Sequence, residues 1–456
     1  MWKPQSLTHT LNPFIYAGQF MTSFKSVPLL FTCLLLLVFG CSSEDAQPAP
    51  SPSPEASEPE NPVSENSDPR ATGRSQEREE IKEPPVLTTP SPEPIPVPAE
   101  DLAEGWIRLF DGGSFFGWKP ENDANWAIED GAITVSEGEQ GLLRTTSEFS
   151  DYVLRLEFKA DKSTNSGIFL RTSATPTDPT KDCYEFNIAP TDNPFPTGSL
   201  VGRTKIENAP TSGEWQTAEI TVQGNQIRGI VDGNLVLEYT DESPIGRGYI
   251  GLQLNSGQVA FRNILLRPLS LDSIFNGTDL TGWVEYPEME SKFSVTAAGE
   301  LNVVNGRGQL ETEGHYADFV LQLECISYAE ALNSGIFLRC IPGDVMMGYE
   351  SQIQNGMKDG NPLQPADCGT GGIFRRQDAR RIVALDNEWF HKTIVMSGNH
   401  IAVWVNGYQV SDWYDEREAD KNPRRGLRTA AGSIMIQGHD PTTNLSFRNL
   451  RITELE

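Results

Sequence analysis

The larger part of this chain is an internal repeat. From Gly105 onward, short motifs of the 456-residue sequence recur in the same order after about 165 residues. The run Asn-Ser-Gly-Ile-Phe-Leu-Arg at 165–171 returns unchanged at 333–339. Other matching pairs are 110–112 with 275–277, 184–185 with 349–350, 214–215 with 388–389, and 261–263 with 447–449. A period this long predicts two tandem domains, which we place at 101–269 and 270–456.

Each copy shows the residue pattern of half-buried strands. Tyr152, Leu154, Leu156 and Phe158 alternate with other residues, and 319–326 has a similar alternation. Gly-Asn and Asp-Gly pairs between such runs are typical of hairpin turns. No stretch keeps a helical period for 12 residues. Many short strands predict an all-β fold, with a two-sheet antiparallel sandwich of the jelly-roll kind in each copy.

The repeated motifs, taken together, point to a known family. They are Phe-Asp/Asn-Gly with Gly-Trp, Asn-Ser-Gly-Ile-Phe-Leu-Arg, Tyr-Glu, Glu-Trp, Gly-Asn with Val-Asp/Asn-Gly, and a closing Phe-Arg-Asn. In this order they resemble the 3-keto-disaccharide hydrolase family, formerly a domain of unknown function, over about 105–269 and 272–455. The resemblance implies two tandem concanavalin-like jelly-roll sandwiches. It also implies hydrolysis or lyase-type cleavage of glycosides oxidised to a ketone at sugar position three.

Such a substrate requires a base and a positive group. The ketone acidifies the proton on C2, and loss of that proton expels the group on C1, so a carboxylate or imidazole must sit near a charge that holds the enolate oxygen. Glu350 lies on a strand whose Tyr349 points the other way, and His439 follows the penultimate strand of the second copy. We expect Glu350 or His439 to be the base, with Arg339 as electrostatic support.

The remaining candidates are polar or aromatic residues expected to bind substrate. They are Gln352, Glu324, Trp413, Glu185, Arg171 and Asn187. The second copy is expected to be the active one, because Asn255 stands in the first copy where the second has His439, and because Asn355 and Asp359 are found only in the second. Glu350 with His439 is also a tentative site for a divalent metal ion. For the Glu–Arg pairs, the alternative is a structural ion pair that orders the sheet.

Two further readings follow from the same residues. Two lectin-like modules that hold a polysaccharide without cleaving it remain an alternative to an enzyme, since two weak sites on one chain gain avidity. A net charge of −27 argues against nucleic acid as a partner, because phosphate recognition needs clustered Lys and Arg. Carbohydrate is the expected partner in either case.

The N-terminus resembles a bacterial lipoprotein signal. The uncharged run Val27–Phe39 is too short to span a membrane and ends in Val-Phe-Gly-Cys, so residues 1–41 are predicted to be a signal peptide with Cys41 as the lipidation site. Ser42 after it favours the outer membrane. Residues 42–100 hold 14 of the 32 prolines and are predicted to be a disordered tether. The protein is therefore expected to be exported and lipid-anchored in the cell envelope.

Four cysteines remain after the signal and lipidation positions are set aside. They are Cys183, Cys325, Cys340 and Cys368. An exported protein can form disulfides, and Cys325 and Cys340 flank a turn of the second copy. A Cys325–Cys340 disulfide and free buried thiols are equally compatible with the sequence.

Overall fold

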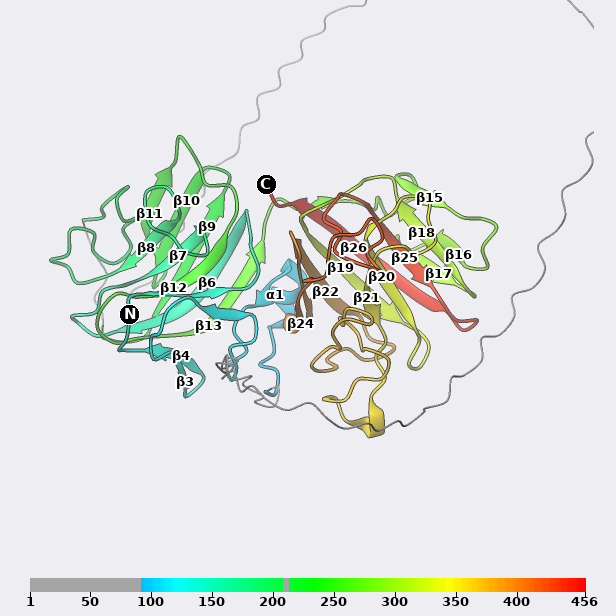
Figure 1. Ribbon diagram of the computed structural model, residues 1–456, viewed down its shortest axis with the longest axis horizontal. Helices are drawn as coiled ribbons and strands as arrows, with labels where there is room; N and C mark the ends of the chain where they lie inside the picture. Colours follow the sequence, from blue (N-terminus) through cyan, green and yellow to red (C-terminus); the bar gives the residue numbers. More distant parts are fainter. Residues whose placement is uncertain (1–91, 208–212) are drawn as a thin grey trace, which may run out of the picture. The chain divides into compact units, whose positions relative to one another are not determined.

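The computed structural model describes residues 92–207 and 213–456, and these form two antiparallel β-sandwiches (Figure 1). The signal peptide, Cys41 and most of the tether lie outside the described residues. A single short helix, α1 (Ala99–Glu104), precedes the first sandwich among them. No helix in the described ranges is long and apolar enough to cross a membrane.

The first sandwich is built from one larger and one five-stranded sheet. The larger sheet has the order β11-β10-β9-β6-β13-β4-β3, with β1 also paired to β13, and the smaller has the order β2-β5-β12-β7-β8. Their bounds are β1 Ile107–Arg108, β2 Trp118–Pro120, β3 Ala127–Glu129, β4 Ala132–Val135, β5 Gly141–Thr145, β6 Tyr152–Ala160, β7 Ser166–Thr172, β8 Tyr184–Ile188, β9 Gln216–Gln223, β10 Gln226–Val231, β11 Asn234–Thr240, β12 Tyr249–Leu254 and β13 Val259–Pro268.

The second sandwich repeats this topology strand for strand. Its larger sheet has the order β16-β17-β26-β19-β22-β23-β24, with β14 paired to β26, and its smaller sheet has the order β15-β18-β25-β20-β21. Their bounds are β14 Asp272–Ser273, β15 Trp283–Glu285, β16 Lys292–Val295, β17 Leu301–Val304, β18 Gly308–Thr312, β19 Phe319–Ser327, β20 Ser334–Cys340, β21 Tyr349–Ile353, β22 Phe390–Ser397, β23 His400–Val405, β24 Tyr408–Tyr414, β25 Ser433–Gly438 and β26 Asn444–Glu454, and a short 3-10 helix spans Lys358–Gly360.

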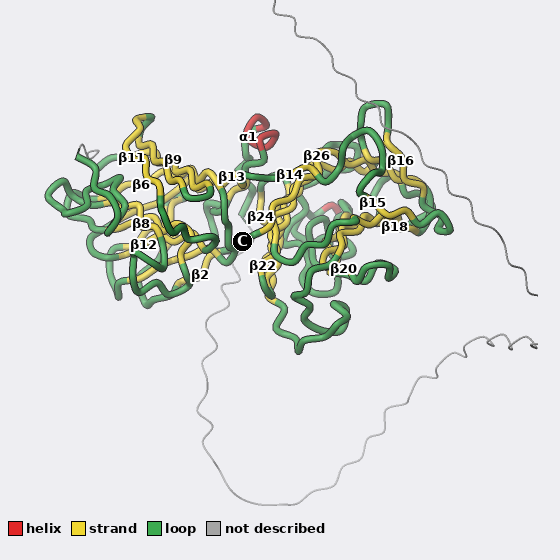
Figure 2. Tube along the Cα trace, turned by 90° about the horizontal axis from the view of Figure 1, so that it is seen from above, coloured by secondary structure: helices red, strands yellow, loops and turns green. Residues whose placement is uncertain are grey.

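The core of each sandwich lies between its two sheets. Figure 2 shows β26 and β16 in one layer of the second sandwich and β18 and β20 in the other. Tyr152, Leu154, Leu156 and Phe158, which the alternation placed inward, are buried in the first core. The predicted all-β fold of two tandem jelly-roll sandwiches is confirmed.

Several strands are buried on both faces instead of alternating, and β19 is one of them. All nine residues of β19 are buried, including those on its outer face. The reason is contact with the first copy: Val320 belongs to the first core cluster, and Gln322 Nε2 donates to the Gly105 carbonyl at 2.8 Å. Trp404 of β23 also joins that cluster and donates to the Arg108 carbonyl at 3.0 Å. The two sandwiches therefore share apolar packing.

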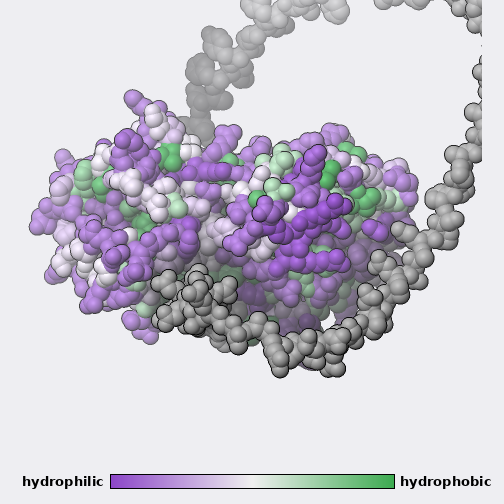
Figure 3. Space-filling view, in the orientation of Figure 1, coloured by the Kyte–Doolittle hydropathy of each residue, from purple (hydrophilic) through white to green (hydrophobic). Residues whose placement is uncertain are grey.

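The surface outside these contacts is mainly polar. Figure 3 shows one face on which hydrophilic side chains predominate and apolar ones are scattered. This agrees with an acidic chain that carries 63 Asp and Glu against 36 Lys and Arg. The four cysteines of the globular part are free and buried, so the structure contains no Cys325–Cys340 disulfide.

Candidate active site

The candidate site lies on the outer face of the smaller sheet of the second sandwich. β21 pairs with β20 in a register that sets Glu350 opposite Phe337 and Gln352 opposite Gly335. Tyr349 and Ile353 of β21 belong to the core cluster, so Glu350 and Gln352 point to the opposite, outer face. The alternation of side chains along β21 therefore places the carboxyl group of Glu350 on this face.

Gly335 makes room for that carboxyl group. A Cβ at position 335 would lie 2.9 Å from both Cγ and Oε1 of Glu350. In the first copy, a Cβ on Gly167 would lie 3.0 Å from Cγ and 3.1 Å from Oε1 of Glu185. In both copies the glycine of the repeated Asn-Ser-Gly-Ile motif therefore leaves room for the glutamate side chain of the neighbouring strand.

Glu350 borders a pocket of about 220 Å³. The pocket is lined by residues of β21 and of two loops, namely Gly348, Tyr349, Glu350, Ile373, Phe374, Arg375, Arg376, Pro423 and Arg424. Burial raises the pKa of Glu350 to about 7, and the charges of Arg424 and His439 oppose that rise. Such a carboxyl group changes protonation state near neutral pH, as a general base should.

The arginines of this pocket come partly from a segment found only in the second copy. Tyr184 donates to Asp241 and accepts from the Ile245 amide, while Tyr349 donates to Asp415 and accepts from the Arg428 amide. These equivalent bonds align Asp241 with Asp415 and Ile245 with Arg428. Three residues, 242–244, lie between them in the first copy, against twelve, 416–427, in the second. We call residues 416–427 the arginine segment.

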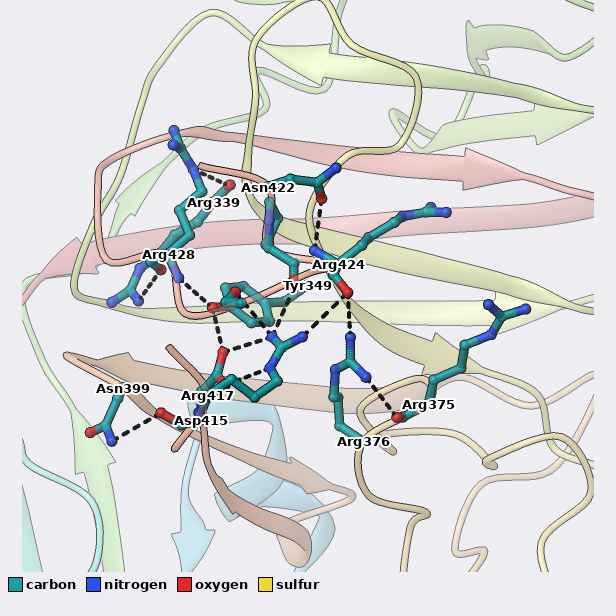
Figure 4. Close-up of polar contacts among 12 residues, drawn as sticks. Arg339, Tyr349, Arg375, Arg376, Asn399, Asp415, Arg417, Asn422, Arg424 and Arg428 are labelled. Carbon is teal, nitrogen blue, oxygen red and sulfur yellow. Dashed lines mark hydrogen bonds and ion pairs between the residues drawn. The ribbon is translucent and has the colours of Figure 1, made fainter. Parts of the chain in front are cut away.

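Arg417 anchors the arginine segment. Its guanidinium binds Asp415 through Nε at 2.7 Å and Nη2 at 2.8 Å, and Nη2 also donates to the carbonyls of Pro423 at 2.8 Å and Gly426 at 3.1 Å (Figure 4). In the first copy, Arg203 binds Asp241 at 2.7 Å instead. Its equivalent in the second copy, Arg376, donates to the Arg424 carbonyl at 2.8 Å and forms no bond to Asp415.

A second group of polar side chains lies beside Glu350 on the same face. Gln352 Nε2 donates to Asn333 and Asp367, and Asn333 Nδ2 donates to Asp367 at 2.9 Å. Among the described residues, Oε1 of Gln352 and Oε1 of Gln437 are buried acceptors without a donor. A buried acceptor left unpaired is costly, and a sugar hydroxyl is a suitable donor for it. Gln352 itself is fully buried, so its role in substrate binding stays a prediction.

His439 stands at the end of β25 near this site. Its Nδ1 lies 2.6 Å from Asp440 Oδ1, and its side chain is 45% exposed. Its charge acts on Glu350, so the structure brings these two candidates to the same region. Within the described ranges, no group of three or more His, Cys, Asp or Glu side chains is placed to hold a metal ion. Glu350 and His439 are only two such side chains, so the tentative site for a divalent metal stays a prediction.

Arg339 does not reach the pocket, so its predicted role in supporting the enolate is wrong. It is 1% exposed, and all its bonds are internal: to the carbonyls of Ala317, Gly398 and Arg428 and to Asp318 Oδ1 at 2.6 Å. Arg171 does the same in the first copy, with Asp151 as its acid. The physical cause is a bulge, because both arginines have φ of +46° and the β20–β25 register shifts between Phe337 and Cys340.

Glu324, Trp413 and Asn187 also occupy structural positions. Glu324 lies on the larger sheet, where it binds Arg448 at 2.6 Å and accepts from Asn449, so the alternative of a structural ion pair holds for it. Trp413 is half-buried against the second core beside Tyr349, with ring centroids 6.2 Å apart, and the Arg417 guanidinium lies 5.8 Å from its ring centre. Asn187 is buried and donates to the Phe195 carbonyl.

The first copy has the equivalent carboxyl group, Glu185, but lacks the pocket-lining arginines of the second copy. Burial raises the pKa of Glu185 to about 7, as for Glu350. The amides of Val201 and Phe374 donate to the carbonyls of Glu185 and Glu350, which aligns Gly202 with Arg375. The first copy has Gly202 at the position of Arg375 and no counterpart of Arg424. Arg203, its equivalent of Arg376, is held by Asp241. This asymmetry favours the second copy as the reactive one.

Sequence reasoning missed a buried lysine under the site. Lys392 of β22 lies in the second core, and its Nζ donates to the carbonyls of Ser351 at 2.9 Å and Gln352 at 2.8 Å. Burial lowers the pKa of Lys392 to about 7, and its charge in turn lowers the pKa of Glu350. When Trp215 is aligned with Trp389, Ala218 of the first copy stands at the position of Lys392. A lysine in place of an alanine on a core-facing strand position was the signal in the sequence that could have identified it.

Comparison with known proteins gives consistent matches. The model of the 3-keto-alpha-glucoside-1,2-lyase-like domain matches residues 105–267 and 271–453. A 3-keto-disaccharide hydrolase of Bacteroides thetaiotaomicron is 29% identical, over 37% of this chain and 79% of its own length. A solved candidate glycosyl hydrolase from Parabacteroides distasonis is 25% identical, with a TM-score of 0.33, over 41% of this chain and 84% of its own. The carbohydrate-binding module CBM66 of Bacillus subtilis is 15% identical, with a TM-score of 0.27, over 33% of this chain and 95% of its own.

Proposed function

Because the chain belongs to the 3-keto-alpha-glucoside-1,2-lyase-like family and carries two copies of its domain, we propose that its second sandwich cleaves glycosides that bear a ketone at sugar position three. The observation that carries this proposal is Glu350, a half-buried carboxyl group with a pKa near 7 in a pocket lined by guanidinium groups that have no acid partner. The name of the Bacteroides relative supports the same substrate class. The reaction depends on moving one proton.

Glu350 begins the reaction as a carboxylate. It takes the proton from C2, and the electron pair of the C2–H bond forms the enolate with the neighbouring ketone. The guanidinium of Arg424, whose charge already acts on Glu350, stabilises the enolate oxygen. Collapse of the enolate forms the C1–C2 double bond and breaks the C1–O bond, and the leaving oxygen takes the proton back from Glu350. Addition of water across the double bond would complete a net hydrolysis.

The test uses paired variants in the full chain. Glu350→Gln should lower the turnover of a 3-keto disaccharide by at least about two orders of magnitude, the usual worth of a positioned base. Glu185→Gln is the matched control, because it alters the equivalent buried carboxyl of the first copy, and it should keep turnover near that of the parent. Parental turnover in Glu350→Gln would refute the assignment. Glycan binding without any product in the parent would favour the lectin-like alternative.

We also propose that the protein is exported and carries a lipid on Cys41 that anchors it to the outer membrane. The support is the Val-Phe-Gly-Cys sequence after an uncharged run and the Ser at position 42. Mass spectrometry of the N-terminal peptide should show an acylated Cys41 in the parent. Cys41→Ala should leave the protein without lipid and release it from the membrane fraction, and an unmodified Cys41 in the parent would overturn the proposal.

A further inference from the structure

Three guanidinium groups of the pocket have no acid partner. Within residues 92–207 and 213–456, the side chains of Arg375, Arg376 and Arg424 form no ion pair with a carboxylate. Arg376 and Arg424 donate only to backbone carbonyls, and Arg375 lies with its guanidinium 5.3 Å from the Phe374 ring centre. In a chain of net charge −27, acids are abundant, and none of them is used here.

Two of these side chains, Arg376 and Arg424, are held in place by hydrogen bonds. Arg424 Nη2 donates to the Met346 carbonyl at 2.7 Å, and its amide is capped by Asn422 Oδ1 at 2.9 Å. Arg376 binds the Arg424 carbonyl, so the two loops that carry the arginines are tied together. In Figure 4 the guanidinium groups of Arg375 and Arg424 extend away from the Asp415–Arg417 pair. The first copy has neither the arginine segment nor an arginine at 202.

A count of charges leaves the pocket positive. The three guanidinium groups line the same pocket as Glu350, which is an anion when ionised, and Asp367 adds a second negative charge that acts on Glu350. His439 adds a positive charge only when protonated, and it lies against Asp440. Proton transfer from C2 moves one negative charge from Glu350 to the enolate oxygen without changing the total. At least one positive charge therefore remains without a partner during the reaction.

We propose that Arg375 and Arg376 bind an anionic substituent of the sugar while Arg424 serves the enolate oxygen, so that the second sandwich acts on acidic rather than neutral glycosides. This inference rests on the proposed function for its reacting group and adds the class of substrate. Guanidinium groups bind carboxylates and sulfates through paired N–H donors, which makes a uronate carboxylate and a sulfate ester the two sources of the same charge. The neutral 3-keto glucosides would then be poorer ligands.

The experiment measures binding, so that it does not depend on turnover. The full chain is titrated by calorimetry or ligand-observed NMR with methyl glucuronide, methyl glucoside 6-sulfate and methyl glucoside. At least one acidic ligand should bind about ten-fold more tightly than the neutral one, and raising the salt from about 50 to 300 mM should weaken only the acidic ligands. The better of the two acids identifies the source of the charge.

Variants then separate this site from general surface charge. Arg375→Ala removes a guanidinium that makes no hydrogen bond in the fold, and it should reduce acid binding about ten-fold with no change in melting temperature. Arg425→Ala is the matched control, an exposed arginine of the same segment that does not line the pocket, and it should bind as the parent does. Equal binding of neutral and acidic ligands, no binding of any of them, or parental binding in Arg375→Ala would each overturn the proposal. Glu350→Gln should keep the preference, so failure of the catalytic proposal would be seen separately.

Discussion

Arg417 takes in the second sandwich the place that Arg203 holds in the first, because each guanidinium binds the aspartate that also accepts from the tyrosine beside the candidate glutamate. The acids are Asp415 and Asp241, at 2.7 Å in both cases. The substitution frees Arg376, the sequence equivalent of Arg203, to bind the Arg424 carbonyl. The second sandwich therefore has the structural ion pair, made by Arg417, and also an arginine, Arg376, that lines the pocket.

Arg417→Met should therefore loosen the arginine segment. It removes the partner of Asp415, which is 1% exposed, together with the bonds to the carbonyls of Pro423 and Gly426. An unpaired buried acid costs about 2–4 kcal/mol, so we expect a loss of that order in the free energy of unfolding and a loss of turnover. Urea denaturation and proteolysis within 416–427 would measure it. The control Arg425→Ala should change neither, and an intact segment in Arg417→Met would contradict the prediction.

The pKa of Glu350 predicts opposite effects of pH on rate and stability. Because its pKa is about 7 in the folded chain against 4.5 ordinarily, the carboxylate is the main form only above pH 7. If it is the base, kcat/KM should rise with pH through an apparent pKa near 7. Between pH 4.5 and 7 the folded chain keeps a proton on Glu350 that the unfolded chain has lost. The contribution of Glu350 to stability is therefore full below pH 4.5 and is lost as the pH rises through 7.

Glu350→Gln separates these effects. It removes the cost of holding a buried carboxylate, so at pH 8 the variant should gain about 1–2 kcal/mol in the free energy of unfolding over the parent, and much less at pH 5. Glu185→Gln should show a similar gain in stability, since burial raises the pKa of Glu185 in the same way. Only Glu350→Gln should abolish turnover. Equal stability of Glu350→Gln and parent at both pH values would show that the carboxyl is not desolvated.

Lys392 predicts a second, distinct pH dependence. Its pKa is lowered to about 7 by burial, so between pH 7 and its ordinary value of 10.5 the unfolded chain binds the extra proton and stability rises with pH. The slope contributed by this group approaches about 1.4 kcal/mol per pH unit. Lys392→Met should remove that slope between pH 7.5 and 9.5 in urea denaturation, whereas the exposed control Lys421→Met should keep it. An unchanged slope in Lys392→Met would contradict the burial of an uncharged amine.

The sequence predicted the fold and the position of Glu350 for the same reason, namely the alternation of side chains along a strand. It failed where the backbone breaks that alternation. Arg339 was assigned to the open face, but the bulge at its φ of +46° turns it to Asp318 and three carbonyls. The sequence also made no prediction where loops build the site. Arg424 lines the same pocket as Glu350 although it belongs to the segment 416–427, far from β21 along the chain. Spacing within one strand carries no information about such a contact.

Gly335 has no side chain, and this leaves space for Glu350. A methyl group there would lie 2.9 Å from two atoms of the glutamate, closer than van der Waals contact, and must displace its side chain. Since Gly335 does not have a positive φ, the backbone itself tolerates alanine, and the effect should fall on the carboxyl group. We expect Gly335→Ala to lower turnover about ten-fold or more, because catalysis is sensitive to displacements of about 1 Å.

Gly167→Ala provides the matched control for this change. It introduces the same crowding against Glu185, at 3.0 and 3.1 Å, in the copy without the arginine segment. Both variants should lose a similar amount of stability, of the order of 1–2 kcal/mol, which urea denaturation would measure. Only Gly335→Ala should lose turnover of a 3-keto disaccharide. If Gly167→Ala lost turnover and Gly335→Ala kept it, the reacting carboxyl would be Glu185, and the assignment of activity to the second sandwich would have to be reversed.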